Sequence, residues 1–170
     1  MVTSLAERLK KDPSDGEGWM MLGRSYVVLG RLEDARAALE KAYKLSPANP
    51  DMLAAYAEVI GRQGDNRLAG RPRELLAEAL NVNPMHPKSL WLSGVAAMQA
   101  GEDSVAVSHW QTLRKSGALN ADETASLDRF IAEANGASPA PPAIVSAPPT
   151  ATASSTSNPA TASPSSEGVS

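Results

Sequence analysis

The feature that most constrains the fold is a repeat marked by prolines. Asp12-Pro13, Ser46-Pro47 and Asn83-Pro84 each follow an amphipathic stretch, and the three prolines are 34 and then 37 residues apart. A proline disfavours helical backbone at the residue before it, so each site separates one helix from the next. Self-similarity at this period predicts an array of helical hairpins.

The residues between these prolines follow the tetratricopeptide (TPR) pattern of small and large side chains. The first copy contains Trp19, Leu22, Gly23, Tyr26, Ala35, Leu39, Ala42 and Pro47. Looser copies contain Leu53, Tyr56, Ala57, Ile60, Leu76, Ala79 and Pro84, and then Leu90, Gly94, Ala97, Ala106 and Trp110. We therefore predict an all-α fold, a right-handed TPR superhelix of about three helical hairpins with a flanking helix at each end. Ser93, where the pattern expects a large apolar residue, is its clearest departure.

Glycines and capping residues predict where the helices meet and end. Gly23 and Gly94 are expected to let the two helices of a hairpin approach closely. The first helix of each hairpin is expected to end in a left-handed glycine at Gly30, Gly64 and Gly101. Residues 121–134 form an amphipathic stretch preceded by a capping box, and they predict a helix that closes the array.

Composition divides the chain into two parts. Residues 1–135 carry the repeats and are predicted to form the TPR domain, whereas residues 136–170 are rich in Pro, Ala, Ser and Thr. Such a tail cannot bury enough apolar surface to offset the entropy of ordering it, so we expect residues 136–170 to be disordered. Residues 3–11 have the register of a second helix of a hairpin, so we expect the natural protein to begin earlier than Met1.

Several function classes are disfavoured by the composition. The formal net charge of −3 comes from interspersed acidic and basic residues, so no nucleic-acid partner is expected. Cysteine is absent, which excludes thiolate metal sites and haem attachment through a C-x-x-C-H motif. Neither His86 nor His109 belongs to a catalytic or metal-binding motif. We therefore expect no enzyme activity and no cofactor or metal.

The residue that follows each core position of a first helix lies beside the buried stripe, because a helix advances 100° per residue. These residues and their neighbours are expected to line the concave wall of the superhelix and bind a peptide. The predicted peptide-binding residues are Met20, Arg24, Val27, Glu58, Arg62, Lys88, Trp91, Val95 and Met98. The apolar members would form a trough for an amphipathic helix, and Trp91→Ala would weaken binding without loss of helicity. In the alternative interpretation, the apolar members belong to the core.

One stretch resembles a known family. Residues 70–113, "GRPRELLAEALNVNPMHPKSLWLSGVAAMQAGEDSVAVSHWQTL", together with "GEGWMMLGRSYVVLGRLEDA", resemble the periplasmic TPR domain of the bacterial cytochrome c biogenesis proteins CcmI or CycH. The resemblance rests on the Gly70-Arg71-Pro72 insertion, on the residues from Asn83 to Leu90, and on Ala106-x-x-x-Trp110-Gln111-x-Leu113. It extends from about Leu5 to Ala134.

The resemblance implies a chaperone that holds the C-terminal helix of unfolded apocytochrome c and presents it for haem ligation. It also implies contacts with other components of cytochrome c maturation. The location would be the periplasmic side of the bacterial inner membrane, with membrane attachment only through an N-terminal part missing from this chain. A TPR scaffold for another envelope or secretion assembly is the alternative that shares every fold feature.

Overall fold

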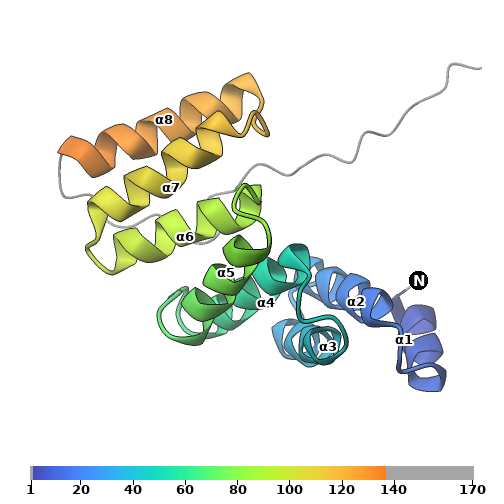
Figure 1. Ribbon diagram of the computed structural model, residues 1–170. Coiled ribbons are helices and arrows are strands. Elements are labelled where there is room, and N and C mark those ends of the chain that lie inside the picture. Colours follow the sequence, from blue (N-terminus) through green and yellow to red (C-terminus); the bar gives the residue numbers. More distant parts are fainter. Residues whose placement is uncertain (1, 137–170) are drawn as a thin grey trace, which may run out of the picture.

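The computed structural model describes residues 2–136, and these form eight α-helices without a strand (Figure 1). Three consecutive hairpins make up the array, and one further helix flanks it at each end. The helices are α1 (Val2–Lys11), α2 (Gly16–Val28), α3 (Leu32–Leu45), α4 (Pro50–Gln63), α5 (Arg71–Val82), α6 (Pro87–Gln99), α7 (Asp103–Lys115) and α8 (Ala121–Gly136). The predicted all-α TPR fold is confirmed. The predicted disordered tail lies, apart from Gly136, outside the described residues.

Close approach within the hairpins depends on glycine opposite a large side chain. A Cβ atom added at Gly94 would lie 2.0 Å from Nε1 of Trp110, and one added at Gly23 would lie 2.6 Å from Cγ of Leu39. Both large side chains are fully buried, so neither can move aside without opening the core. The predicted role of these two glycines is confirmed.

The turn of the second hairpin differs from the sequence prediction. Gly30 and Gly101 adopt the left-handed conformation, with φ of 71° and 73°, but Gly64 has a φ of −99°. The left-handed residues there are Asp65 and Asn66, because the chain continues through an insertion before α5 begins.

Leu68 inside this insertion is fully buried and fixes the loop against the third hairpin. Its backbone N–H donates to Oε1 of Gln99 at 2.8 Å, and Nε2 of Gln99 donates to the carbonyl oxygen of Asn66 at 2.7 Å. A side chain from α6 therefore holds the loop between α4 and α5.

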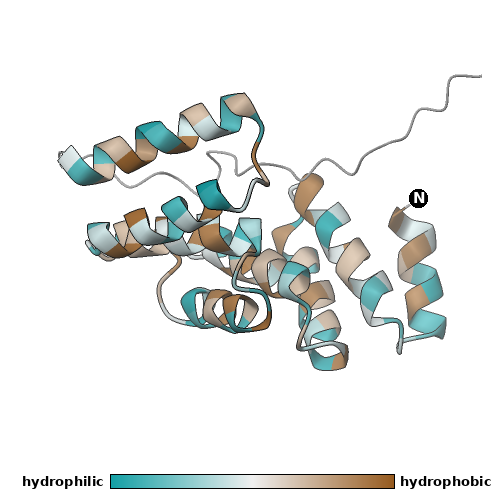
Figure 2. Ribbon diagram, turned by 45° about the horizontal axis from the view of Figure 1, so that its top comes forward, coloured by the Kyte–Doolittle hydropathy of each residue, from teal (hydrophilic) through white to brown (hydrophobic). Residues whose placement is uncertain are grey.

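The closing helix α8 packs on α7 as predicted. Its capping box is formed, since the N–H of Glu123 donates to Oδ1 of Asn120 and the N–H of Asn120 donates to Oε2 of Glu123, both at 2.9 Å. Leu127 and Ile131 are buried, while Phe130 is half-buried. Apolar and polar residues alternate along the helices, as the amphipathic pattern requires (Figure 2). Within residues 2–136, no helix combines the length and the apolar character needed to cross a membrane.

Candidate protein-interaction surface

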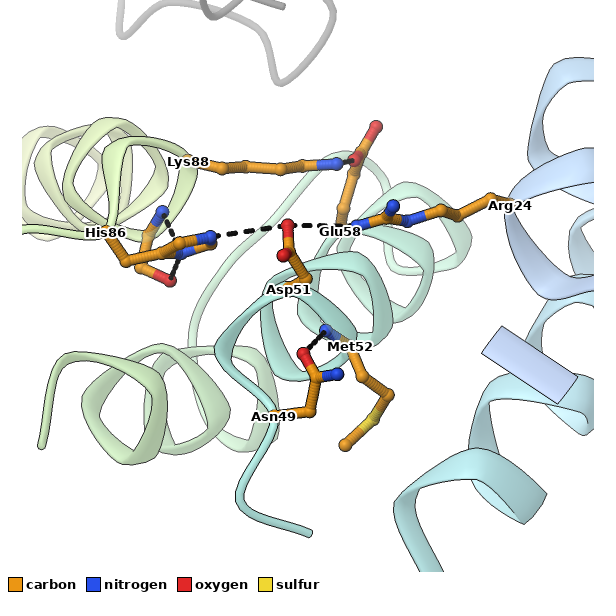
Figure 3. A network of polar contacts seen from close by, with 8 residues as sticks. Arg24, Asn49, Asp51, Met52, Glu58, His86 and Lys88 are labelled. Atoms are coloured by element: carbon orange, nitrogen blue, oxygen red, sulfur yellow. Dashed lines mark hydrogen bonds and ion pairs between the residues drawn. The ribbon is translucent and has the colours of Figure 1, made fainter. Parts of the chain in front are cut away.

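Polar side chains connect the first helices of the three hairpins, α2, α4 and α6. Nη2 of Arg24 on α2 lies 3.0 Å from Oδ1 of Asp51 on α4. The same oxygen lies 3.4 Å from Nε2 of His86, the residue that caps α6 (Figure 3). The carboxylate of Asp51 therefore joins one residue from each neighbouring hairpin.

A second set of ion pairs is centred on Glu58. Its two carboxylate oxygens lie 2.6 Å from Nη2 of Arg62 and 2.5 Å from Nζ of Lys88. Only 9% of Glu58 is exposed, and a carboxylate buried to this extent is costly unless it is paired. Each oxygen has its own cation, so α4 and α6 are linked and their charges are held in fixed positions.

His86 has a defined protonation state in this arrangement. Its Nδ1 accepts a hydrogen bond from the backbone N–H of Ser89 at 3.3 Å, so the ring proton is on Nε2, which faces Asp51. Burial lowers the pKa of His86, and the nearby carboxylate of Asp51 opposes that shift. His86 therefore acts as a neutral helix cap that also connects α6 to α4.

We use the name charged surface for the six residues Arg24, Asp51, Glu58, Arg62, His86 and Lys88. Sequence analysis placed four of them, Arg24, Glu58, Arg62 and Lys88, among the candidate binding residues. The structure joins Glu58, Arg62 and Lys88 in one set of ion pairs, whereas Arg24 belongs to the set centred on Asp51. The sequence analysis did not identify Asp51 and His86 as members of this surface. His86 precedes Pro87, and a residue before a proline that begins a helix is in the capping position.

The predicted apolar trough is wrong for its two central residues. Trp91 is only 2% exposed and Val95 is fully buried, whereas Met20, Val27 and Met98 are half-buried. The ring of Trp91 stacks on Trp110 at 5.8 Å and meets the edge of Phe130 at 5.2 Å between ring centroids. The physical reason is that Phe130 of α8 covers the side of α6 on which Trp91 lies. The accessible wall is consequently more charged than the sequence suggested.

The described residues offer no cluster suited to a metal. Within residues 2–136, no group of three or more His, Cys, Asp or Glu side chains is arranged to hold a metal ion. Pairs of opposite charge are the main polar feature of the charged surface, and such pairs contribute electrostatic complementarity to protein association.

Comparison with known proteins identifies the family. The family described as "Cytochrome c-type biogenesis protein H TPR domain" matches residues 1–124. The chain belongs to this family. Cytochrome c-type biogenesis protein CcmH of Escherichia coli (strain K12) is 33% identical over 137 residues, and this match covers 79% of the chain and 38% of the relative. Cytochrome c-type biogenesis protein CycH of Rhizobium meliloti (strain 1021) is 29% identical over 142 residues, which cover 84% of the chain and 37% of the relative.

The chain thus spans less than two fifths of the length of these two cytochrome c-type biogenesis relatives. Among solved structures, the fold of this TPR domain is similar to the crystal structure of MamA, with a TM-score of 0.67 and 17% identity. That similarity covers 78% of the chain and 74% of MamA. It concerns the fold alone.

Proposed function

We propose that this TPR domain acts in bacterial cytochrome c maturation as a non-catalytic chaperone that holds a segment of an apocytochrome c. The segment is the C-terminal amphipathic helix of the apocytochrome. The site consists of the charged surface and the half-buried Met20 and Val27 of α2 and Met98 of α6. Membership of the cytochrome c-type biogenesis family supports the role. The periplasmic side of the bacterial inner membrane is the location that this proposal assigns to the domain.

The observation that carries the proposal is the pair of ion-pair sets that joins α2, α4 and α6. Asp51 holds Arg24 of α2 and Glu58 holds Lys88 of α6, so these side chains are ordered before a partner arrives. Side chains that are already ordered lose less conformational entropy on binding, which favours affinity. A partner helix with charges of both signs fits this surface, because it can pair with the partly exposed Arg24, Asp51 and Lys88.

The surface also suits a partner that must be released. Its exposed charges contribute roughly 0.2–1 kcal/mol per pair and are screened by salt. Half-buried methionines add contacts that adapt to different side chains. Binding of this kind is fast and reversible, as required of a chaperone that passes its client to haem ligation. The half-buried side chains and the ion pairs together favour micromolar affinity.

The test is fluorescence anisotropy of a labelled peptide that matches the C-terminal helix of a c-type cytochrome. The variant is Arg24→Gln combined with Lys88→Gln, which removes two cations and leaves Glu58 paired with Arg62. We expect the dissociation constant to rise about 5- to 30-fold, equivalent to about 1–2 kcal/mol. Arg36→Gln, on the exposed side of α3, is the matched control and should change the constant less than about twofold.

The scaffold alternative predicts a different outcome. If the domain is instead a TPR scaffold for another envelope or secretion assembly, it should show no measurable affinity for the cytochrome peptide. Circular dichroism then serves as the control that the protein tested is folded. Peptide affinity that is unchanged in the double variant would instead place the partner elsewhere on the domain.

A further inference from the structure

A hollow of about 240 Å³ lies between Trp91 of α6, the end of α7 and the part of α8 from Asp122 to Phe130. Its described lining is mainly apolar and consists of Trp91, Leu113, Leu119, Asp122, Glu123, Ser126, Leu127 and Phe130. Pockets for drug-sized ligands have volumes of roughly 300–1,000 Å³. This hollow is smaller, so it fits one side chain rather than a cofactor.

The charges around the hollow are mostly negative. Two of its eight described lining residues are acidic and none of them is basic. Asp122 is exposed and forms no ion pair with any residue in the described range 2–136, whereas Glu123 is engaged in the capping box. The nearest cation on the same helix is Arg129, whose Nη2 donates to Oγ of Ser126 at 3.1 Å. A cation on the occupant would therefore be stabilised beside Asp122.

The hollow and the charged surface share helix α6, since Trp91 lines the hollow and Lys88 belongs to the charged surface. Lys88 and Trp91 are three residues apart on α6, and Lys88 reaches Glu58 of α4 whereas Trp91 packs on Trp110 of α7 and Phe130 of α8. Trp91 also carries unused hydrogen-bonding capacity, because its indole Nε1 is buried without an acceptor among residues 2–136. Helix α6 thus contributes one residue to each site, about one helical turn apart along its axis.

We propose that this hollow receives one aromatic or branched aliphatic side chain of a partner polypeptide that carries a Lys or Arg next to that side chain. The proposal rests on the proposed function insofar as the partner is the segment bound at the charged surface. It adds a second point of attachment, with the apolar side chain against Trp91, Leu127 and Phe130 and the cation beside Asp122. The two points together fix the direction in which the segment lies.

The hollow can be probed without any cytochrome peptide. Phenethylammonium has an aromatic ring and a cation, and phenylacetate has a similar ring with an anion. We expect phenethylammonium to bind with millimolar affinity and to shift the indole N–H resonance of Trp91 in a two-dimensional 1H–15N spectrum. Phenylacetate should bind at least about fivefold more weakly. Equal affinity for the two probes would contradict the charge argument, and no shift with either would contradict the site.

Variants of α8 provide the structural control. Ser126→Leu fills the hollow, whereas Ala125→Leu adds the same side chain at the adjacent exposed position. We expect Ser126→Leu to abolish the shift by phenethylammonium and Ala125→Leu to preserve it. Asp122→Asn should reduce the preference for the cationic probe, whereas Glu33→Gln on α3 should not. A Ser126→Leu protein that is folded and still binds the probe normally would overturn the proposal.

The same variants separate this inference from the proposed function. If the cytochrome peptide binds wild type and Ser126→Leu equally, and the small probe does not bind, the hollow is not used but the proposed function stands. If the small probe binds as predicted and the cytochrome peptide does not bind wild type, the hollow is a site for a different partner, and the proposed function fails.

Discussion

Replacement of Trp91 by alanine is expected to destabilise the domain strongly. The indole is 98% buried, since its exposed fraction is 2%, and it packs on Trp110 and Phe130. Removing a large aromatic side chain from a core costs about 3–5 kcal/mol, which includes the cavity that it leaves. Small domains have total stabilities of roughly 5–15 kcal/mol, so a large fraction would be lost. This expectation replaces the sequence-based one, in which Trp91→Ala affected only binding.

Urea unfolding followed by circular dichroism measures this cost directly. The matched control is Met21→Ala on α2, because Met21 is 55% exposed and should change the unfolding free energy by less than about 0.5 kcal/mol. Trp91→Phe should be much milder than Trp91→Ala, since it keeps a ring and removes the indole donor that has no acceptor in the described part of the chain. A loss of less than about 1 kcal/mol in Trp91→Ala would show that this side chain is not part of a packed core.

Three further predictions concern the packing and the pH dependence of the fold. Gly94→Ala should lower the unfolding free energy by about 2 kcal/mol or more, because the added Cβ would lie 2.0 Å from Nε1 of the buried Trp110. Urea unfolding measures this loss. An unchanged urea midpoint would contradict the contact. Ser93→Leu should raise the melting temperature and increase the unfolding free energy by about 1 kcal/mol, because Ser93 borders a hollow of about 100 Å³ between α5, α6 and α7. A lower melting temperature would mean that the hollow cannot hold the added side chain. The unfolding free energy should decrease as the pH falls through about 6.5, because burial lowers the pKa values of His86 and His109 in the folded state and the unfolded chain then binds protons more tightly. His86→Asn retains a capping side chain and should reduce this pH dependence in urea titrations at several pH values. An equal pH dependence in the variant would assign the effect to other groups.

The repeat pattern predicted the fold well because it reports local and periodic requirements. Proline sites marked the helix boundaries, and the small residue at Gly94 predicted the close approach of α6 and α7, at which Trp110 lies opposite it. The capping box at Asn120 and Glu123 likewise depends on residues only three positions apart. Such features are encoded within a few turns of helix and can be recognised in one sequence.

The candidate surface was predicted only in part, because exposure depends on neighbours that are distant in sequence. Helical spacing predicted Trp91 on the concave wall beside the core stripe of α6, because it carried no information about Phe130, which lies 39 positions later and covers it. Asp51 and His86 were missed for a similar reason, since they become partners only when α4 and α6 pack together. Arg24 and Lys88 were identified as charged residues of the first helices, and both side chains are partly exposed in the structure.

The most direct test of the account is to map where a cytochrome partner binds. A peptide that matches the C-terminal helix of a c-type cytochrome is titrated into the 15N-labelled domain, and amide chemical shifts are followed. The account predicts that the largest shifts occur along α2, α4 and α6 around Arg24, Asp51, Glu58 and Lys88. Shifts confined to α3, α5 and α7, or the absence of any shift by a peptide in excess, would contradict it.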